Sequence, residues 1–89
     1  MQEILITAEQ IRAARSVLGW TNVELALKSG VGSATLKRYE AVSGVPLSRK
    51  DNLARIKAAF EAAGIEFIGT PDDAPGIRIH RPKSPQNSV

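Results

Sequence analysis

Four stretches of the chain place apolar residues three and four positions apart, the spacing at which side chains share one face of an α-helix. They cover about residues 7–19, 21–29, 32–40 and 48–63. In the first stretch Ile11, Ala14 and Leu18 share a face, and in the last a stripe runs from Leu53 to Ala63. The pattern predicts a mainly α domain of about four helices.

Three of these stretches begin with a polar residue that can cap a helix. Thr7 with Gln10 and Thr21 with Glu24 have the spacing of a capping box, in which two side chains satisfy free backbone N–H groups at a helix start. Ser48 is the candidate cap of the fourth helix. Helix starts are therefore expected directly after these residues.

The pattern changes beyond Gly64. Residues 65–68 and 77–80 alternate partly and contain β-branched residues, and the turn-forming segment 69–76 separates them. This predicts a β-hairpin with a long loop. Because an isolated two-stranded hairpin is marginally stable in water, it must pack on its own helices or pair with the hairpin of a second chain in a two-fold dimer.

The chain thus divides into a helical domain over residues 1–64, a hairpin and possible dimerisation element over residues 65–81, and a tail over residues 82–89. The tail has almost no apolar residue and is expected to be disordered. The apolar residues within Met1–Ile6 predict an ordered arm packed on the domain or a short edge strand.

Composition argues against catalysis. The chain has no cysteine and one histidine, His80, so a disulfide framework, a thiolate metal site and a histidine cluster are excluded. Asp72 and Asp73 lie together in a predicted turn, where aspartate is favoured for backbone reasons. No glycine-rich loop that cradles phosphate is present. We expect no enzyme, no metal and no cofactor.

No apolar run approaches the ~20 residues that a membrane span requires, and the first residues lack the basic segment of a signal peptide. We therefore expect a cytoplasmic protein without a membrane partner. The net charge of +3 suits a polyanionic partner but does not require one.

The segment over residues 21–40 resembles the helix-turn-helix of lambda-repressor-like (XRE) regulators. The resemblance rests on the structural positions of this motif, which here hold Leu25, Ala26, Gly30, Val31, Leu36 and Tyr39. It implies a small lambda-repressor-like helical domain that binds double-stranded DNA, with residues 32–40 in the major groove. The implied function is a sequence-specific transcriptional regulator, a repressor or activator, acting as a homodimer on a two-fold symmetric site.

The outward face of residues 32–40 carries two cations and no acid before Glu40. By the resemblance, the base-reading positions of this face are Ser33, Ala34, Lys37 and Arg38. The simpler alternative is that this face is an ordinary solvated helix surface without a DNA contact.

Contacts with the DNA backbone are expected first at the start of the second helix, where Thr21 and Asn22 lie next to free N–H groups that favour an anion. The further candidates flank the motif: Lys28, Thr35, Ser43, Arg49 and Lys50. Capping alone is an equal explanation for Thr21. Arg12 and Arg15, on the outer face of the first helix, are expected to be solvated rather than bound to phosphate.

Two residues differ from the family pattern. Gly32 stands where a serine or threonine often precedes the recognition helix, and Asn22 stands where glutamine is frequent. Glycine is an acceptable cap, so the helix should form, whereas the side chain of Asn22 is shorter than that of glutamine and reaches less far toward a phosphate.

A protein-binding role is the alternative function. The hairpin, with Ile77 and Ile79, could dock a regulatory protein partner, as in an antitoxin or in a regulator controlled by an antiactivator. RNA binding is the weakest interpretation, because few aromatic residues are left to stack on bases.

Overall fold

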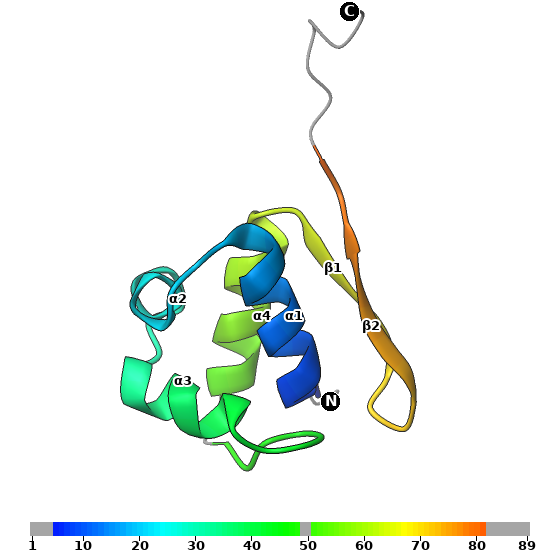
Figure 1. Ribbon diagram of the computed structural model, residues 1–89, viewed down its shortest axis with the longest axis horizontal. Helices are drawn as coiled ribbons and strands as arrows, with labels where there is room; N and C mark the ends of the chain where they lie inside the picture. The colour runs from blue at the N-terminus through cyan, green and yellow to red at the C-terminus, as the bar shows by residue number, and fades with distance from the viewer. Residues whose placement is uncertain (1–4, 49–50, 82–89) are drawn as a thin grey trace, which may run out of the picture.

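Four helices precede a two-stranded antiparallel hairpin (Figure 1). The computed structural model describes residues 5–48 and 51–81. The elements are α1 (Ala8–Leu18), α2 (Asn22–Ser29), α3 (Ser33–Glu40), α4 (Asn52–Ala62), β1 (Ile65–Thr70) and β2 (Asp73–Ile79). The predicted mainly α fold with a C-terminal hairpin is confirmed.

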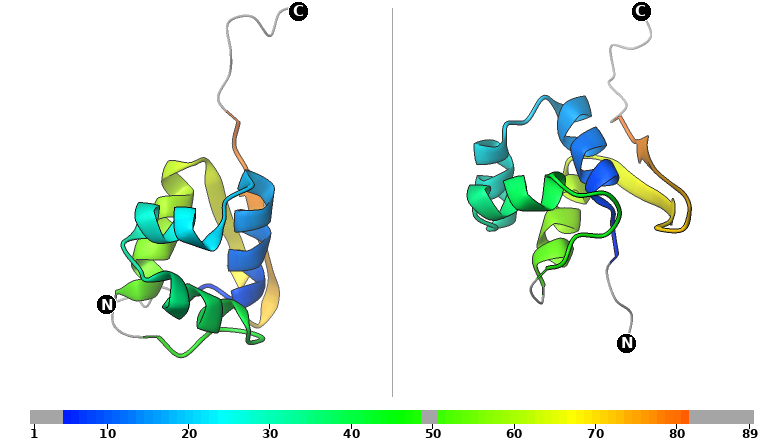
Figure 2. Two further views of the ribbon diagram at one scale, coloured as in Figure 1. Left: turned by 60° about the vertical axis from the view of Figure 1, so that its left-hand side comes forward. Right: turned by 60° about the horizontal axis from the view of Figure 1, so that its bottom comes forward.

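The hairpin packs on one side of the helices, with β1 against α4 and β2 against α1, and α2 and α3 lie on the other side, with α2 against α4 and α3 against α1 (Figures 1 and 2). The apolar faces of the helices meet in one core. Its completely buried members include Ile11, Leu25, Leu36, Ile56 and Phe60. The stripes predicted from helical spacing are therefore the faces that hold the helices together.

Both predicted capping boxes are present. The backbone N–H of Gln10 donates to Thr7 Oγ1 at 3.0 Å, and that of Glu24 donates to Thr21 Oγ1 at 3.0 Å. The side chains of Gln10 and Glu24 in turn accept from the cap backbones. At the other end of α2, Gly30 adopts the left-handed conformation that glycine reaches without strain, with φ of 79°.

The expected start of α4 at Ser48 is wrong. The helix begins at Asn52, and the preceding Asp51 has φ of 75°, which cannot continue a right-handed helix from Ser48. Asp51 makes no side-chain cap. Instead Asn52 Nδ2 donates to the hydroxyl of Tyr39 at 2.9 Å, so a contact with α3 anchors the helix start.

The expected long hairpin loop is also wrong. Thr70 pairs with Asp73, which leaves a two-residue turn, and the irregular residues lie within the strands as a register shift between Ile68 and Thr70. There Gly69 has φ of 75°, and a Cβ on it would lie 2.1 Å from the carbonyl oxygen of Ala74. The glycine allows the two strands to close at this bulge.

The hairpin packs on the helices of its own chain. Gln10 Nε2 donates to the carbonyl oxygens of Ile68, at 3.2 Å, and Gly76, at 2.8 Å. The ring of Phe67 lies edge-on to that of Phe60, with centroids 5.9 Å apart. This contact confirms one of the two packing surfaces expected for the hairpin.

The N-terminal segment enters the core at Ile6, which is 2% exposed, as expected of an arm packed on the domain. Residues 1–4 and the tail over 82–89 lie outside the described residues. Within the described ranges, no helix has the length and apolar character needed to cross a membrane.

Candidate nucleic-acid interface

Helices α2 and α3 are joined by a three-residue turn whose middle residue, Val31, is buried. The backbone N–H of Val31 donates to Ser29 Oγ at 3.1 Å, which closes the turn. Leu36 and Tyr39 attach α3 to the core. The opposite face of α3 is therefore held outward by buried residues at both ends of the helix.

The four base-reading candidates lie together on this outward face. Ala34, Lys37 and Arg38 are exposed, and Ser33 is half-buried at the first turn. Arg38 Nη2 lies 3.4 Å from the hydroxyl of Thr35, a weak contact within the same helix. The α3 face, defined as these five residues, thus has two exposed cations.

Glu40, the acid that ends α3, does not belong to this face. Its side chain is 8% exposed and accepts two hydrogen bonds from Arg15, from Nε at 2.9 Å and from Nη2 at 2.8 Å. The hydrogen bond to Glu40 raises the pKa of Arg15. Arg15 Nη1 also donates to the carbonyl oxygen of Trp20 at 2.9 Å. The carboxylate is neutralised in the interior, so the charge of the α3 face remains positive.

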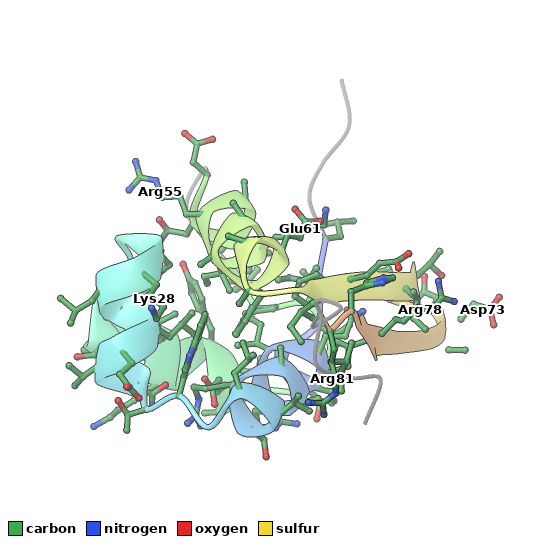
Figure 3. All side chains as sticks on the ribbon, turned by 90° about the horizontal axis from the view of Figure 1, so that it is seen from above. Lys28, Arg55, Glu61, Asp73, Arg78 and Arg81 are labelled. Atoms are coloured by element: carbon green, nitrogen blue, oxygen red, sulfur yellow. The ribbon has the colours of Figure 1, made fainter. Side chains whose placement is uncertain are left out.

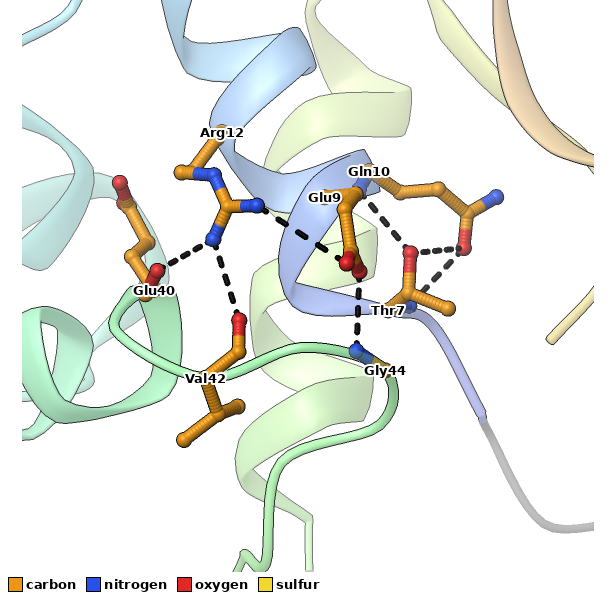
Figure 4. Close-up of polar contacts among 7 residues, drawn as sticks. All are labelled: Thr7, Glu9, Gln10, Arg12, Glu40, Val42 and Gly44. Carbon is orange, nitrogen blue, oxygen red and sulfur yellow. Dashed lines mark hydrogen bonds and ion pairs between the residues drawn. The ribbon is translucent and has the colours of Figure 1, made fainter.

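Arg12 joins α1 to the segment that follows α3 (Figure 4). Its Nη1 donates to the carbonyl oxygens of Glu40 and of Val42, the latter at 3.2 Å. Glu9 completes this junction by accepting from the backbone N–H of Gly44 at 3.0 Å. Hydrogen bonds from the backbone N–H groups of Glu9 itself and of Gly44 lower the pKa of Glu9.

The expectation that the two arginines of α1 are solvated is therefore wrong for Arg15, whose side chain is 27% exposed, and incomplete for Arg12, whose side chain is 42% exposed but also binds the protein. Both bind groups at the end of α3, 25 to 30 residues away in the chain. Sequence spacing within α1 indicates which side chains share a face, but not that another element approaches that face.

Thr21 and Asn22 lie at the start of α2 as expected. Thr21 is exposed and caps the helix. Asn22 Oδ1 is buried and has no hydrogen-bond partner among the described residues. Asn22 is the first residue of α2, where backbone N–H groups have no partner within the helix.

Lys28 is held away from the α3 face. Its Nζ lies 5.0 Å from the ring centroid of Trp20, in the range of a cation–π contact. It borders a groove against Ala59 and Ala62 of α4, and Figure 3 shows it on α2. Lys28 is thus not brought together with the cations of α3.

Of the remaining backbone candidates, Thr35 is half-buried on α3 and Ser43 is exposed in the loop that follows. Arg49 and Lys50 lie outside the described residues. Sequence reasoning missed Ser29, Arg15 and Glu40 as the residues that fix the position of α3.

A polar cluster on the hairpin was also missed. Glu66 Oε1 lies 2.6 Å from His80 Nε2 and 3.3 Å from Arg78 Nη1. The hydrogen bond from His80, together with the charge of Arg78, lowers the pKa of Glu66. The direct pairing of Glu66 with Arg78 across the strands was the available signal, since both residues belong to the predicted strands.

No cluster of three or more potential metal ligands occurs in the part of the chain that the structure describes. Asp72 and Asp73 are exposed at the hairpin turn. Comparison with known proteins gives no match, either to a family model or to a curated protein.

Proposed function

We propose that this protein is a sequence-specific DNA-binding transcriptional regulator of the lambda-repressor-like helix-turn-helix type. One observation carries the proposal: the α3 face presents Lys37 and Arg38 to solvent, while the acid of the same helix, Glu40, is buried against Arg15. A helix of this size fits the major groove, which is about 12 Å wide. The cations then meet an anionic groove without an opposing carboxylate from α3.

The α3 face has the chemistry for direct readout. Arg38 or Lys37 can donate to O6 and N7 of guanine, and the hydroxyl of Ser33 can bond to several bases. Ala34 can contact the methyl group of thymine. Because these residues follow each other around one side of a rigid helix, they would read neighbouring base pairs.

The start of α2 supplies the phosphate contact in this proposal. Free N–H groups and the positive end of the helix dipole favour an anion there. The side chain of Asn22 supplies a further amide beside exposed Thr21. Two copies bound to a two-fold site would place their recognition helices about 34–36 Å apart, one turn of DNA.

Selection from a randomised duplex pool, carried out at two salt concentrations, tests the function. We expect a two-fold symmetric site and an affinity that falls steeply as salt rises. Arg38→Ala should cost about 1–3 kcal/mol on the selected site and relax the preference at one base pair.

Lys57→Ala is the matched control, because it removes one positive charge from α4, where Lys57 pairs with Glu61 at 2.7 Å. It should leave the base preference unchanged. If Arg38→Ala also leaves affinity and preference unchanged, α3 does not read DNA and the proposal fails.

Binding of a regulatory protein through the hairpin is the second candidate function. The observation in its favour is the exposure of Ile79, which is 42% exposed on β2. A protein that acts only in this way would tolerate changes at Lys37 and Arg38 and fail when Ile77 and Ile79 are altered. Binding assays on both sets of variants separate the two functions.

A further inference from the structure

The outer edge of β2 has unpaired backbone groups. His80 N donates to the oxygen of Gly64 at 2.7 Å, and Ile65 lies opposite Ile79 in the register. Hydrogen-bonded pairs alternate in an antiparallel ladder, so the N–H and C=O groups of Ile77 and Ile79 point away from β1. No hydrogen bond from another described residue reaches these groups.

Strand β2 is also the more exposed strand, although one of its faces packs against α1. Proteins usually protect such edges with proline, bulges or charged side chains. Here Pro75 and the register shift protect only the half near the turn. The half that contains Ile77 and Ile79 has neither of these two devices, and its charged side chain, Arg78, is paired with Glu66 of β1.

Exposed apolar side chains flank this unprotected half. Val17, 45% exposed, lies two turns along α1 from Gln10, which binds Gly76. Two helical turns advance ~10.8 Å, and the three residues from Gly76 to Ile79 advance about 10 Å along the strand. Because α1 and β2 run in the same direction (Figure 1) and contact each other, the C-terminal half of α1, which contains Val17, adjoins the C-terminal half of β2.

The charges along the hairpin are opposite at its two ends. Asp72 and Asp73 are exposed at the turn, and His80 and Arg81 are exposed at the other end. Figure 3 shows Asp73 at the tip and Arg81 at the opposite end. Two such edges placed antiparallel bring acid next to base twice, by symmetry.

We propose that the β2 edge, residues 77–81 with the adjoining Val17, binds the β2 edge of a second copy of this chain. The two hairpins form one four-stranded antiparallel sheet around a two-fold axis. The inference rests on the homodimer of the proposed function and names its interface.

The charge pattern selects the register. With Ile77 opposite Ile77 of the second copy, Arg78 faces Gly76, which has no side chain to obstruct it, and Arg81 lies near Asp73. A shift that centres the axis on Arg78 would place the two guanidinium groups opposite each other, which is unfavourable. The first register also lets Ile79 N donate to the carbonyl oxygen of Pro75, twice in the dimer.

Ile79→Pro tests the edge, because it removes an N–H that the hairpin itself does not use, and proline is tolerated on edge strands. Ile79→Val is the matched control, since it keeps the N–H and the branched side chain. By sedimentation equilibrium of the full chain we expect a wild-type dimer. Ile79→Pro should weaken it at least about tenfold, because the hydrogen bond is lost twice. Ile79→Val should dimerise like the wild type.

A charge exchange tests the same interface without altering the backbone. Asp73→Lys and Arg81→Glu should each weaken the dimer, and the double variant should recover it, because each lysine then meets a glutamate of the other copy. A wild-type monomer would overturn the inference, even if the edge captured a strand of another protein. The inference would also be overturned if the wild type is a dimer and neither Ile79→Pro nor either charge reversal weakens it.

The outcome is distinguishable from that of the proposed function. If Ile79→Pro is monomeric but still binds a single half-site, both proposals stand. A dimer that depends on β2 but selects no DNA sequence would remove the function and leave the interface. If Ile79→Pro remains a dimer and binds the selected site as tightly as the wild type, the proposed function stands and the proposed interface fails.

Discussion

Glu40 affects the charge of the α3 face, because its carboxylate is buried and does not belong to that face. If its carboxylate were exposed, it would add a negative charge to the last turn of α3, beside Lys37 and Arg38. Its two hydrogen bonds to Arg15 instead hold it inside and join α1 to α3. One buried pair therefore fixes both the position of the recognition helix in the proposed function and the sign of its charge.

Glu40→Gln should lower the free energy of unfolding by about 2 kcal/mol. Loss of one partner from a fully buried pair costs about 3–5 kcal/mol, and Arg15, with its side chain 27% exposed, recovers part of this through water. Urea denaturation measures the difference.

Glu61→Gln is the control for this change, because the Lys57–Glu61 pair joins residues four apart on an exposed helix surface. It should cost no more than about 0.5 kcal/mol. Equal effects of the two variants would show that the Arg15–Glu40 pair has no special weight.

Glu66 gives a pH-dependent signature. His80 and Arg78 lower its folded pKa, so its contribution to stability is complete above the ordinary glutamate pKa of about 4.3 and is lost as pH falls through the lowered value. In His80→Gln the pKa of Glu66 should rise toward its ordinary value. NMR titration of the carboxyl carbon measures this, and an unchanged midpoint would contradict the role of His80.

At the residue scale, the sequence predicted contacts made between neighbours in the chain. Both capping boxes join residues three apart, and both are present. Arg15 and Glu40 are 25 residues apart, and no local pattern connects them. Their pairing follows from the way α1 and α3 pack, which the separate helix patterns do not specify.

At the element scale, Gln10 connects a helix cap to the hairpin. Its Oε1 accepts from the backbone N–H of Thr7 at 2.9 Å, while its Nε2 binds a carbonyl group on each strand. One buried side chain thus orders the start of α1 and holds the hairpin against it.

Gln10→Ala should loosen the hairpin. Two hydrogen bonds to β1 and β2 are lost, worth about 0.5–1.5 kcal/mol each, so amide exchange of Gly76 and Arg78 should accelerate at least about tenfold. Hydrogen exchange followed by NMR gives the rates.

Glu24→Ala is the matched control, since Glu24 is the corresponding capping-box residue of α2 and makes no contact with the hairpin. It should destabilise α2 without changing the hairpin amides. Hairpin exchange that is equally fast in both variants would indicate general destabilisation rather than a specific link.

The two elements whose bounds were mispredicted share a cause. Asp51 and Ala74 both have positive φ, at 75° and 55°, although neither is a glycine. Local propensity does not predict such conformations, because tertiary packing maintains them. The first three periodic stretches, in contrast, were located correctly, because burial of one face determines both the pattern and the helix.

At the scale of the whole molecule, the cations are separated into groups with different surroundings. Lys37 and Arg38 are on the α3 face, Lys28 covers Trp20, and Arg78 lies on the hairpin next to Glu66. A chain-wide net charge does not reveal this division. The α3 positions could be predicted from sequence, whereas the place of Lys28 depends on how α2 and α4 meet.

This division predicts different salt dependences of DNA binding. Lys37→Ala should reduce the slope of log affinity against log salt by about one, because one charge leaves the proposed interface. Lys28→Ala, with the same loss of net charge, should leave the slope unchanged. Titrations of labelled duplex at several salt concentrations measure both, and equal slopes for the two variants would contradict the division.

Trp20 stacks on Phe60 with ring centroids 5.5 Å apart and is the single tryptophan of the chain. The protein therefore contains a natural optical reporter at the junction of its helices. Emission excited selectively from this indole reports on the packing of α4 against the segment between α1 and α2. Comparison of thermal unfolding followed by this fluorescence with amide exchange of the hairpin would show whether the hairpin detaches before the helices unfold.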